Sequence, residues 1–123
     1  MIGDGLDEAG PELDRYTEQV YLGACMVLGS IPKGAVVKTN EFSTLQHRLV
    51  HNAIIDVTHS GQPLDLITVA NRLDANGTMK LVGLAYLSSL LDHIPDPDSI
   101  CTYARCVKTN AAERRLVEMK AKP

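Results

Sequence analysis

The sequence predicts an all-α fold, a compact bundle of five to six helices that ends in a long C-terminal helix. The core must be mostly aliphatic, because the 123 residues include four tyrosines, one phenylalanine and no tryptophan. Apolar residues recur every three to four positions, which is typical of helices, and capping or helix-stopping residues separate the periodic segments. A chain of 13.4 kDa with ordinary composition fits one domain.

The first periodic segment predicts a helix that Gly29 and Pro32 end. Its apolar stripe is Val20, Ala24, Val27 and Leu28. Before it, residues 1–14 hold three glycines, one proline and five acids without apolar periodicity, which indicates a disordered acidic leader. We therefore expect the helical domain over residues 15–117 and the truncated start of a linker or hairpin region over 118–123. Residues 31–38 can form one further short turn.

Two helices are predicted in the middle of the chain. Ser43 or Thr44 can cap the first, which Gly61 ends, and Asp65 can cap the second after an extended Pro63 step. Their stripes are Leu49, Val50, Ala53, Ile54 and Val57, then Leu66, Val69, Ala70 and Leu73. Residues 76–77, Asn-Gly, are also typical of a hairpin turn, but the flanking periods of three to four favour a helix end.

Two more helices complete the prediction. The first carries Leu84, Leu87, Leu90, Leu91 and Ile94, before prolines at 95 and 97 break it. Asp98 or Ser99 can cap the last helix. Its buried face is Ile100, Tyr103, Ala104, Val107 and Ala111. After Ala111 the stripe loses its phase, so this helix is expected to change what it packs against.

Composition excludes several classes of protein. A net charge of −3 and a pI near 5.7 argue against a domain dedicated to nucleic-acid phosphates, although the start is acidic and the last helix basic. No apolar run approaches the roughly 20 residues that span a bilayer. An odd number of cysteines without a signal peptide favours the reducing cytoplasm. We expect a cytoplasmic domain without a membrane segment.

The sequence offers weak candidates for chemistry. His47 and His51 have the spacing of two ligands to one metal, but Arg48 follows where a zinc protease has Glu, and no third ligand is evident. No Gly-Lys pair exists to build a phosphate loop. We therefore predict no catalytic residue, no metal site and no cofactor in this chain.

Two other groups of residues favour structural roles. The three cysteines, Cys25, Cys101 and Cys106, are expected to be inert thiols of the core or its boundary. The loop cluster of Asp92, His93, Asp96 and Asp98 is expected to solvate an extended link and cap the next helix. The basic C-terminal helix is expected to face solvent or another subunit, with weak or no direct DNA binding.

The order of these segments resembles the N-terminal domain of DnaB-type replicative DNA helicases. The motifs are Glu18-Gln19-Val20 with Leu22-Gly23, Glu41-Phe42, His47-Arg48, residues 61–68 (GQPLDLIT), Leu73, Gly77, Val82-Gly83, Ala85-Tyr86-Leu87, Pro95, Tyr103-Ala104, Val107 and Arg114. They extend over roughly residues 17–117. No single motif is diagnostic, but the combination is specific.

The resemblance implies a non-catalytic collar domain of a larger helicase. In the family this domain mediates oligomerisation, as dimers within a hexameric collar, and docks the C-terminal domain of primase during DNA replication. A helicase loader is a further possible partner. ATP and Mg²⁺ belong to a RecA-like ATPase domain that unwinds duplex DNA and that this chain lacks.

The resemblance also assigns roles to residues. Tyr86 and Arg114 are contact positions by resemblance: Tyr86 corresponds to a surface tyrosine associated with primase contact, and Arg114 is expected either to face another subunit or to pair with an acid. Eight further positions are structural by resemblance: Leu22, Gly23, Phe42, His47, Arg48, Asp65, Thr68 and Gly83. From the residues themselves, Phe42 is expected in the core, Asp65 as a helix cap, and Tyr86 either in the core or at the surface.

Two alternatives stay open at this point. One is a freestanding mimic of the collar that regulates the binding of primase or a loader. The other is a helix-turn-helix-like DNA-binding module, which would bind duplex DNA with a strong dependence on salt.

Overall fold

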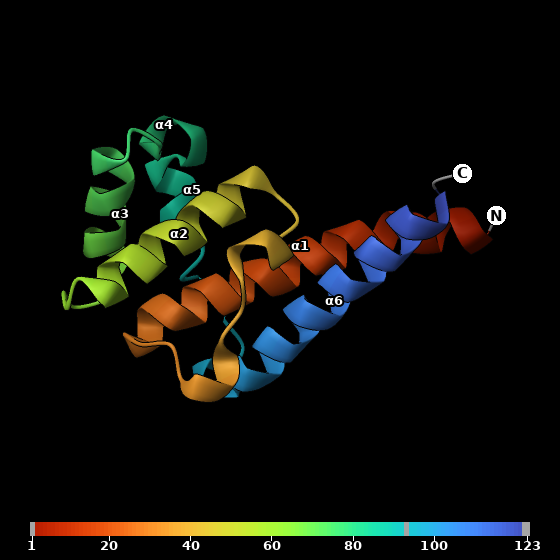
Figure 1. Ribbon diagram of the computed structural model, residues 1–123, viewed down its shortest axis with the longest axis horizontal. Coiled ribbons are helices and arrows are strands. Elements are labelled where there is room, and N and C mark those ends of the chain that lie inside the picture. Colours follow the sequence, from red (N-terminus) through yellow and green to blue (C-terminus); the bar gives the residue numbers. More distant parts are fainter. Residues whose placement is uncertain (1, 93, 122–123) are drawn as a thin grey trace.

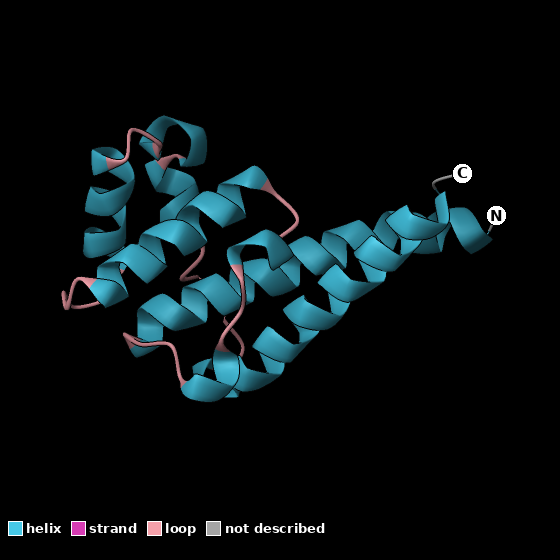
Figure 2. Cartoon of the chain, viewed as in Figure 1, coloured by secondary structure: helices cyan, strands magenta, loops and turns pink. Residues whose placement is uncertain are grey.

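A computed structural model describes residues 2–92 and 94–121, with side chains described from residue 11 onward in those ranges. Within them the chain forms six α-helices and three short 3₁₀ helices, with no strand (Figures 1 and 2). The α-helices are α1 (Ile2–Leu28), α2 (Leu45–His59), α3 (Leu66–Ala75), α4 (Met79–Val82), α5 (Leu84–Ser89) and α6 (Ile100–Ala121). The 3₁₀ helices are η1 (Lys33–Ala35), η2 (Thr39–Glu41) and η3 (Pro97–Ser99). The predicted all-α class is confirmed.

The molecule has a head and a stalk. Helices α1 and α6 lie side by side and run in opposite directions, with both ends of the chain at the same end of the pair (Figure 1). We call residues 11–17 of α1 and 110–121 of α6 the stalk. The head, at the other end of the pair, is residues 18–109. It contains α2 to α5, the three 3₁₀ helices, and the adjoining parts of α1 and α6.

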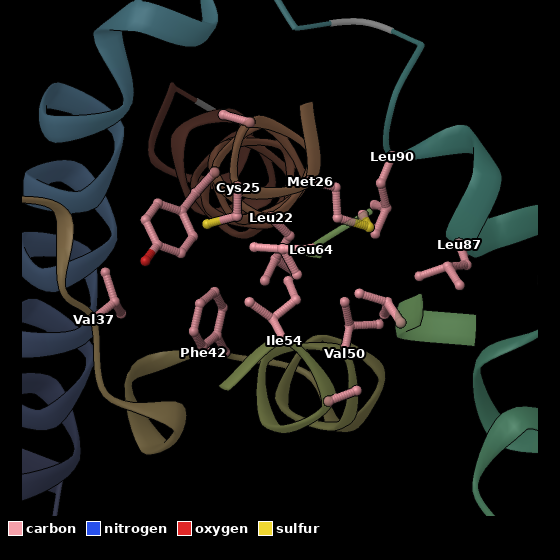
Figure 3. Packing of buried hydrophobic residues seen from close by; sticks show 14 of the residues in the cluster. Leu22, Cys25, Met26, Val37, Phe42, Val50, Ile54, Leu64, Leu87 and Leu90 are labelled. Carbon is pink, nitrogen blue, oxygen red and sulfur yellow. The ribbon is translucent and has the colours of Figure 1, made fainter. Parts of the chain in front are cut away.

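The core of the head lies between α1 and α2. Leu22 and Cys25 of α1 face Val50 and Ile54 of α2, and Phe42 fills the space beside them (Figure 3). Leu87 and Leu90 close one side of this layer, and Val37 lies on the other side, next to α6 (Figure 3). All of these side chains are buried, as expected for Phe42.

Two predicted core residues are exposed instead. Val27 is 52% exposed and Leu84 is 59% exposed. Residues 20–26 of α1 are all buried, and this burial ends at Val27, one residue before the end of the helix at Leu28. Leu84 is the first residue of a short helix whose buried member is Leu87. Both predictions were wrong only at a helix end, because burial stops before Val27 and begins after Leu84, while other members of the same stripes, such as Ala24 and Leu87, are buried.

Most predicted helix ends are confirmed. The hydroxyl oxygen of Thr44 accepts a hydrogen bond from the His47 N–H at the start of α2. Asp65 caps α3, because its carboxylate accepts from the Thr68 N–H while the Thr68 hydroxyl oxygen accepts from the Asp65 N–H. The glycines predicted to end α1, α2 and α3, at positions 29, 61 and 77, all have positive φ. The predicted short turn at residues 31–38 is η1.

The segment between α3 and α6 differs from the prediction. An unexpected short helix, α4, precedes Gly83, whose φ of 84° is a conformation that favours glycine and lets the chain turn into α5. Helix α5 ends at Ser89, before the predicted Ile94. The cap before α6 is Asp96, rather than Asp98 or Ser99, because its carboxylate accepts from the Asp98 N–H and the Ser99 hydroxyl.

The start of α1 also differs from the expected leader. The helix begins at Ile2, although residues 1–14 were expected to lack regular structure. At the end of that segment Asp14 is tied to α6, because its carboxylate lies 3.3 Å from Nη1 of Arg114. Acidic residues near a helix N-terminus are also favoured by the helix dipole. Burial of α1 begins at Glu18, close to the expected domain boundary.

Candidate functional site

A pair of fully buried polar residues lies at the junction of head and stalk. Glu18 and His47 are each 1% exposed, and Oε1 of Glu18 lies 2.7 Å from Nδ1 of His47. Both carboxylate oxygens of Glu18 also accept the backbone N–H of Ser43, at 3.1 and 3.0 Å. Burying a polar group is costly unless it is hydrogen-bonded, and these bonds meet that requirement.

Tyr86 of α5 completes the chain of hydrogen bonds on one side. Its hydroxyl lies 2.6 Å from Nε2 of His47, and the two rings stack with centroids 5.9 Å apart. The amide of Gln19 donates to the same hydroxyl at 3.1 Å. When the neutral His47 ring donates its Nδ1–H to the Glu18 carboxylate, its Nε2 accepts the Tyr86 O–H. Burial raises the pKa of Tyr86, which keeps its hydroxyl proton in place.

Arg114 of α6 lies on the other side of Glu18. Its Nη1 is 3.9 Å from Oε2 of Glu18 and 3.3 Å from Oδ2 of Asp14, and its Nη2 donates to the carbonyl oxygen of Glu41 at 2.8 Å. The structure therefore joins Tyr86 and Arg114, the two contact residues implied by the resemblance, through one buried carboxylate. We call Gln19, Glu18, Ser43, His47, Tyr86 and Arg114 the Glu18 network.

Other motif residues hold the backbone around this network. Nε of Arg48 donates to the carbonyl oxygen of Phe42 at 2.9 Å, which fixes the loop that carries Ser43. Leu22 is fully buried. A methyl group added to Gly23 would overlap the carbonyl oxygen of Leu90 and lie 2.9 Å from its carbonyl carbon. Glycine is therefore needed where α1 meets the end of α5.

The sequence alone did not indicate the Glu18 network. Glu18 and Gln19 were noted only as part of a family motif, and Ser43 only as a candidate helix cap. The hydrogen-bonded partners lie 29 residues apart for Glu18 and His47, 39 for His47 and Tyr86, and 67 for Gln19 and Tyr86. The apolar periodicity of a single helix carries no information about hydrogen bonds between residues so far apart in the sequence.

Residues 11–109 match the family model of the DnaB-like helicase N-terminal domain. The chain belongs to this family. It is 31% identical over 103 residues to the replicative DNA helicase DnaB of Geobacillus stearothermophilus, a match that covers 81% of this chain and 23% of that helicase. It is 33% identical over 115 residues to DnaB of Mycobacterium leprae, covering 88% of this chain and 18% of that protein.

Solved structures agree with this assignment. The crystal structure of the N-terminal domain of DnaB helicase from Mycobacterium tuberculosis superposes with a TM-score of 0.79 at 32% identity, covering 84% of this chain and 77% of that one. The chain spans only about a quarter or less of the length of these two curated helicases, 23% and 18%. The resemblance stated from the sequence motifs is thus confirmed for the family and the fold.

The second histidine of α2 sits in a different environment within this DnaB-type domain. His51 is 1% exposed and packs against the ring of Phe42, with centroids 4.8 Å apart. Its Nδ1 lies 2.7 Å from the hydroxyl of Thr39, whereas its buried Nε2 has no hydrogen-bond partner among the described residues. Burial lowers the pKa of His51 to about 4, so the ring is neutral near pH 7.

The metal hypothesis gains no support from this geometry. His47 and His51 use their Nδ1 atoms on different partners, and the described residues hold no group of three or more potential metal ligands. In the loop cluster of Asp92, His93, Asp96 and Asp98, Asp96 serves as a helix cap, and His93 lies outside the described residues.

Two of the three thiols lie where they were expected, in the core or at its boundary, whereas Cys106 is exposed on α6. Cys25 is buried, Cys101 partly buried and Cys106 exposed, and all three are free. Burial raises the pKa of the Cys25 thiol to about 12, which keeps it protonated and unreactive near neutral pH. No helix among the described residues combines the length and apolarity that crossing a membrane requires.

A groove of about 730 Å³ opens beside Arg114, between the stalk and the loop before α2. Its walls carry both signs of charge, and its lining includes Asp14, Arg15, Ser43, Glu113 and Arg114. The Arg114 side chain is 31% exposed. Arg114 can therefore be reached from solvent while it remains part of the Glu18 network.

Proposed function

We propose that this domain is the collar module of a replicative DNA helicase, and that it mediates helicase self-association and docks the C-terminal domain of primase through a surface that includes Tyr86 and Arg114. In that setting it works in the cytoplasm, and a separate ATPase domain supplies ATP and Mg²⁺ chemistry. A helicase loader is a second partner to test against the same surface.

Membership of the DnaB N-terminal domain family is the observation that carries this proposal. The Glu18 network adds support, because it holds both contact positions in defined places while leaving each partly exposed. A tyrosine and an arginine that are fixed before binding are favourable anchors, since less side-chain freedom is lost when a partner docks.

Light scattering of the purified chain, with and without a primase C-terminal domain at tens of micromolar, tests the proposal. We expect a complex whose mass is the sum of its parts. Tyr86→Ala and Arg114→Ala should each weaken it about tenfold or more. Tyr103→Ala and Arg115→Ala are matched controls, since both residues lie outside the Glu18 network, and they should bind as the wild type does.

Three results would contradict this proposal. One is the absence of any complex with the wild-type chain. Another is equal weakening by the control variants, which would place the contact elsewhere. Tight, salt-dependent binding to duplex DNA in a gel-shift titration would instead favour the DNA-binding alternative.

A further inference from the structure

We propose that Glu18 and His47 are positioning residues, which hold Tyr86 and Arg114 in one fixed arrangement for their partner. This inference rests on the proposed function in one respect, namely that Tyr86 and Arg114 are contact residues. Neither positioning residue can touch a partner itself, because both are buried to 1% exposure.

The surroundings of Tyr86 explain why it needs an anchor. Helix α5 has only six residues and follows the turn at Gly83, so Tyr86 sits on a short segment. Its hydroxyl is fixed from two directions, by Nε2 of His47 at 2.6 Å and by the amide of Gln19 at 3.1 Å. The stacked His47 ring, tilted by only 17°, further limits how the tyrosine ring can rotate.

The energetics of burial also point to positioning rather than stability. A buried ion pair or polar pair adds little net stability, and apolar residues of similar volume in its place often leave a protein equally stable. The Glu18 and His47 pair is nevertheless hydrogen-bonded, beside a core cluster of apolar side chains. What such a pair supplies over an apolar one is direction, because hydrogen bonds fix angles as well as distances.

One carboxylate serves both contact residues. Oε1 of Glu18 lies 2.7 Å from His47, and Oε2 lies 3.9 Å from Nη1 of Arg114. The Ser43 N–H bonds both oxygens and holds the carboxylate in its plane. A change at His47 therefore acts first on Tyr86, while a change at Glu18 acts on Tyr86 and Arg114 together.

A double-mutant cycle tests this assignment. In His47→Asn the shorter amide can still donate to Glu18 but does not reach Tyr86, whereas Tyr86→Phe removes the same bond from the other side. We expect each variant to weaken binding of the primase C-terminal domain three- to tenfold. Because both remove one interaction, the double variant should bind no more weakly than the weaker single variant.

The chain provides a matched control on the same helix. His51→Asn makes the same exchange at a residue that is equally buried but whose hydrogen bond goes to Thr39 and whose ring lies against Tyr21 and Phe42. It should leave binding within twofold of the wild type. If it weakens binding as much as His47→Asn does, the effect is loss of folding rather than of positioning, and the inference is overturned.

A second readout does not depend on the partner. With tyrosines labelled by ¹³C at the ring carbon that bears the hydroxyl, Tyr86→Phe identifies the Tyr86 resonance. We expect His47→Asn to shift that resonance and His51→Asn to leave it in place. An unmoved resonance in His47→Asn overturns the positioning role. Absence of wild-type binding would sink the proposed function alone, since this spectrum still decides whether His47 positions Tyr86.

Discussion

The head and the stalk use the same two helices in opposite ways. In the head, α1 presents Leu22, Cys25 and Met26 to the core, and all three are buried. In the stalk, Leu13 of α1 and Val117 of α6 are exposed by 63% and 67%. Charged side chains, such as Asp14 and Arg114, make the cross-links there instead. Helices in proteins gain most of their stability from packing of an apolar face, and α1 has such packing in the head, where residues 20–26 are buried.

The largest expected effect is in the head. Gly23→Ala should lower the free energy of unfolding by about 3 kcal/mol or more, because the added methyl group meets the backbone of Leu90 rather than a movable side chain. Chemical denaturation followed by circular dichroism measures this change. Gly34→Ala is the matched control, since the nearest atom to its methyl group is the Cys101 sulfur at 3.2 Å, and it should cost about 1 kcal/mol or less. Equal losses of stability in the two variants would show that the close contact between Gly23 and the Leu90 backbone is not what makes Gly23→Ala costly.

The next effect, also in the head, depends on pH. His51 has a pKa of about 4 in the folded domain against 6.5 for a free histidine, so below pH 6.5 the unfolded chain binds a proton that the folded domain excludes. Stability should fall as the pH drops from about 6.5 to 4, by up to about 1.4 kcal/mol per unit and about 3 kcal/mol in all.

Comparison of variants isolates this contribution from that of the carboxylates. Unfolding of His51→Asn, measured at several pH values, should show a shallower loss of stability over this range than the wild type. His59→Asn is the control, because His59 is exposed at the end of α2, and it should keep the wild-type slope. A wild-type slope in His51→Asn would mean that another group carries the acid sensitivity.

The smallest effects are expected in the stalk and at its edge. Arg114→Ala should cost about 1 kcal/mol, since it removes a partly buried ion pair with Asp14 and a hydrogen bond to Glu41. Lys108→Ala should cost about 0.5 kcal/mol or less, because its side chain is 47% exposed and lies 3.6 Å from Glu41. If Lys108→Ala lowered the free energy of unfolding more than Arg114→Ala, the burial of an ion pair would not determine how much it contributes to stability.

Local features of the fold could be predicted from sequence, and long-range ones could not. The caps at Thr44 and Asp65 are hydrogen bonds to residues three positions later, so the local sequence is enough to predict them. The exposed Val27 shows the limit, since an apolar stripe predicts a helix but not the residue at which its burial by other elements ends.

The candidate site shows the same division. Tyr86 and Arg114 could be singled out by resemblance, but that both are linked to the Glu18 carboxylate could not, because Glu18 lies 29 residues before His47 and 96 residues before Arg114 in the chain. The complete burial of His47 and His51 was likewise missed, since histidine suits both surface and core. Only tertiary contact decides which environment each ring receives.

The pairing of α1 with α6 has a consequence for the order of folding during synthesis. These are the first and last helices of the described residues, and they lie side by side (Figure 1). Until residues 100–111 have left the ribosome, the face of α1 that α6 covers has no partner, and Ala104 and Val107 cannot yet pack. During synthesis α1 can therefore pack against α2 early, but its packing is complete only after α6 has been synthesised.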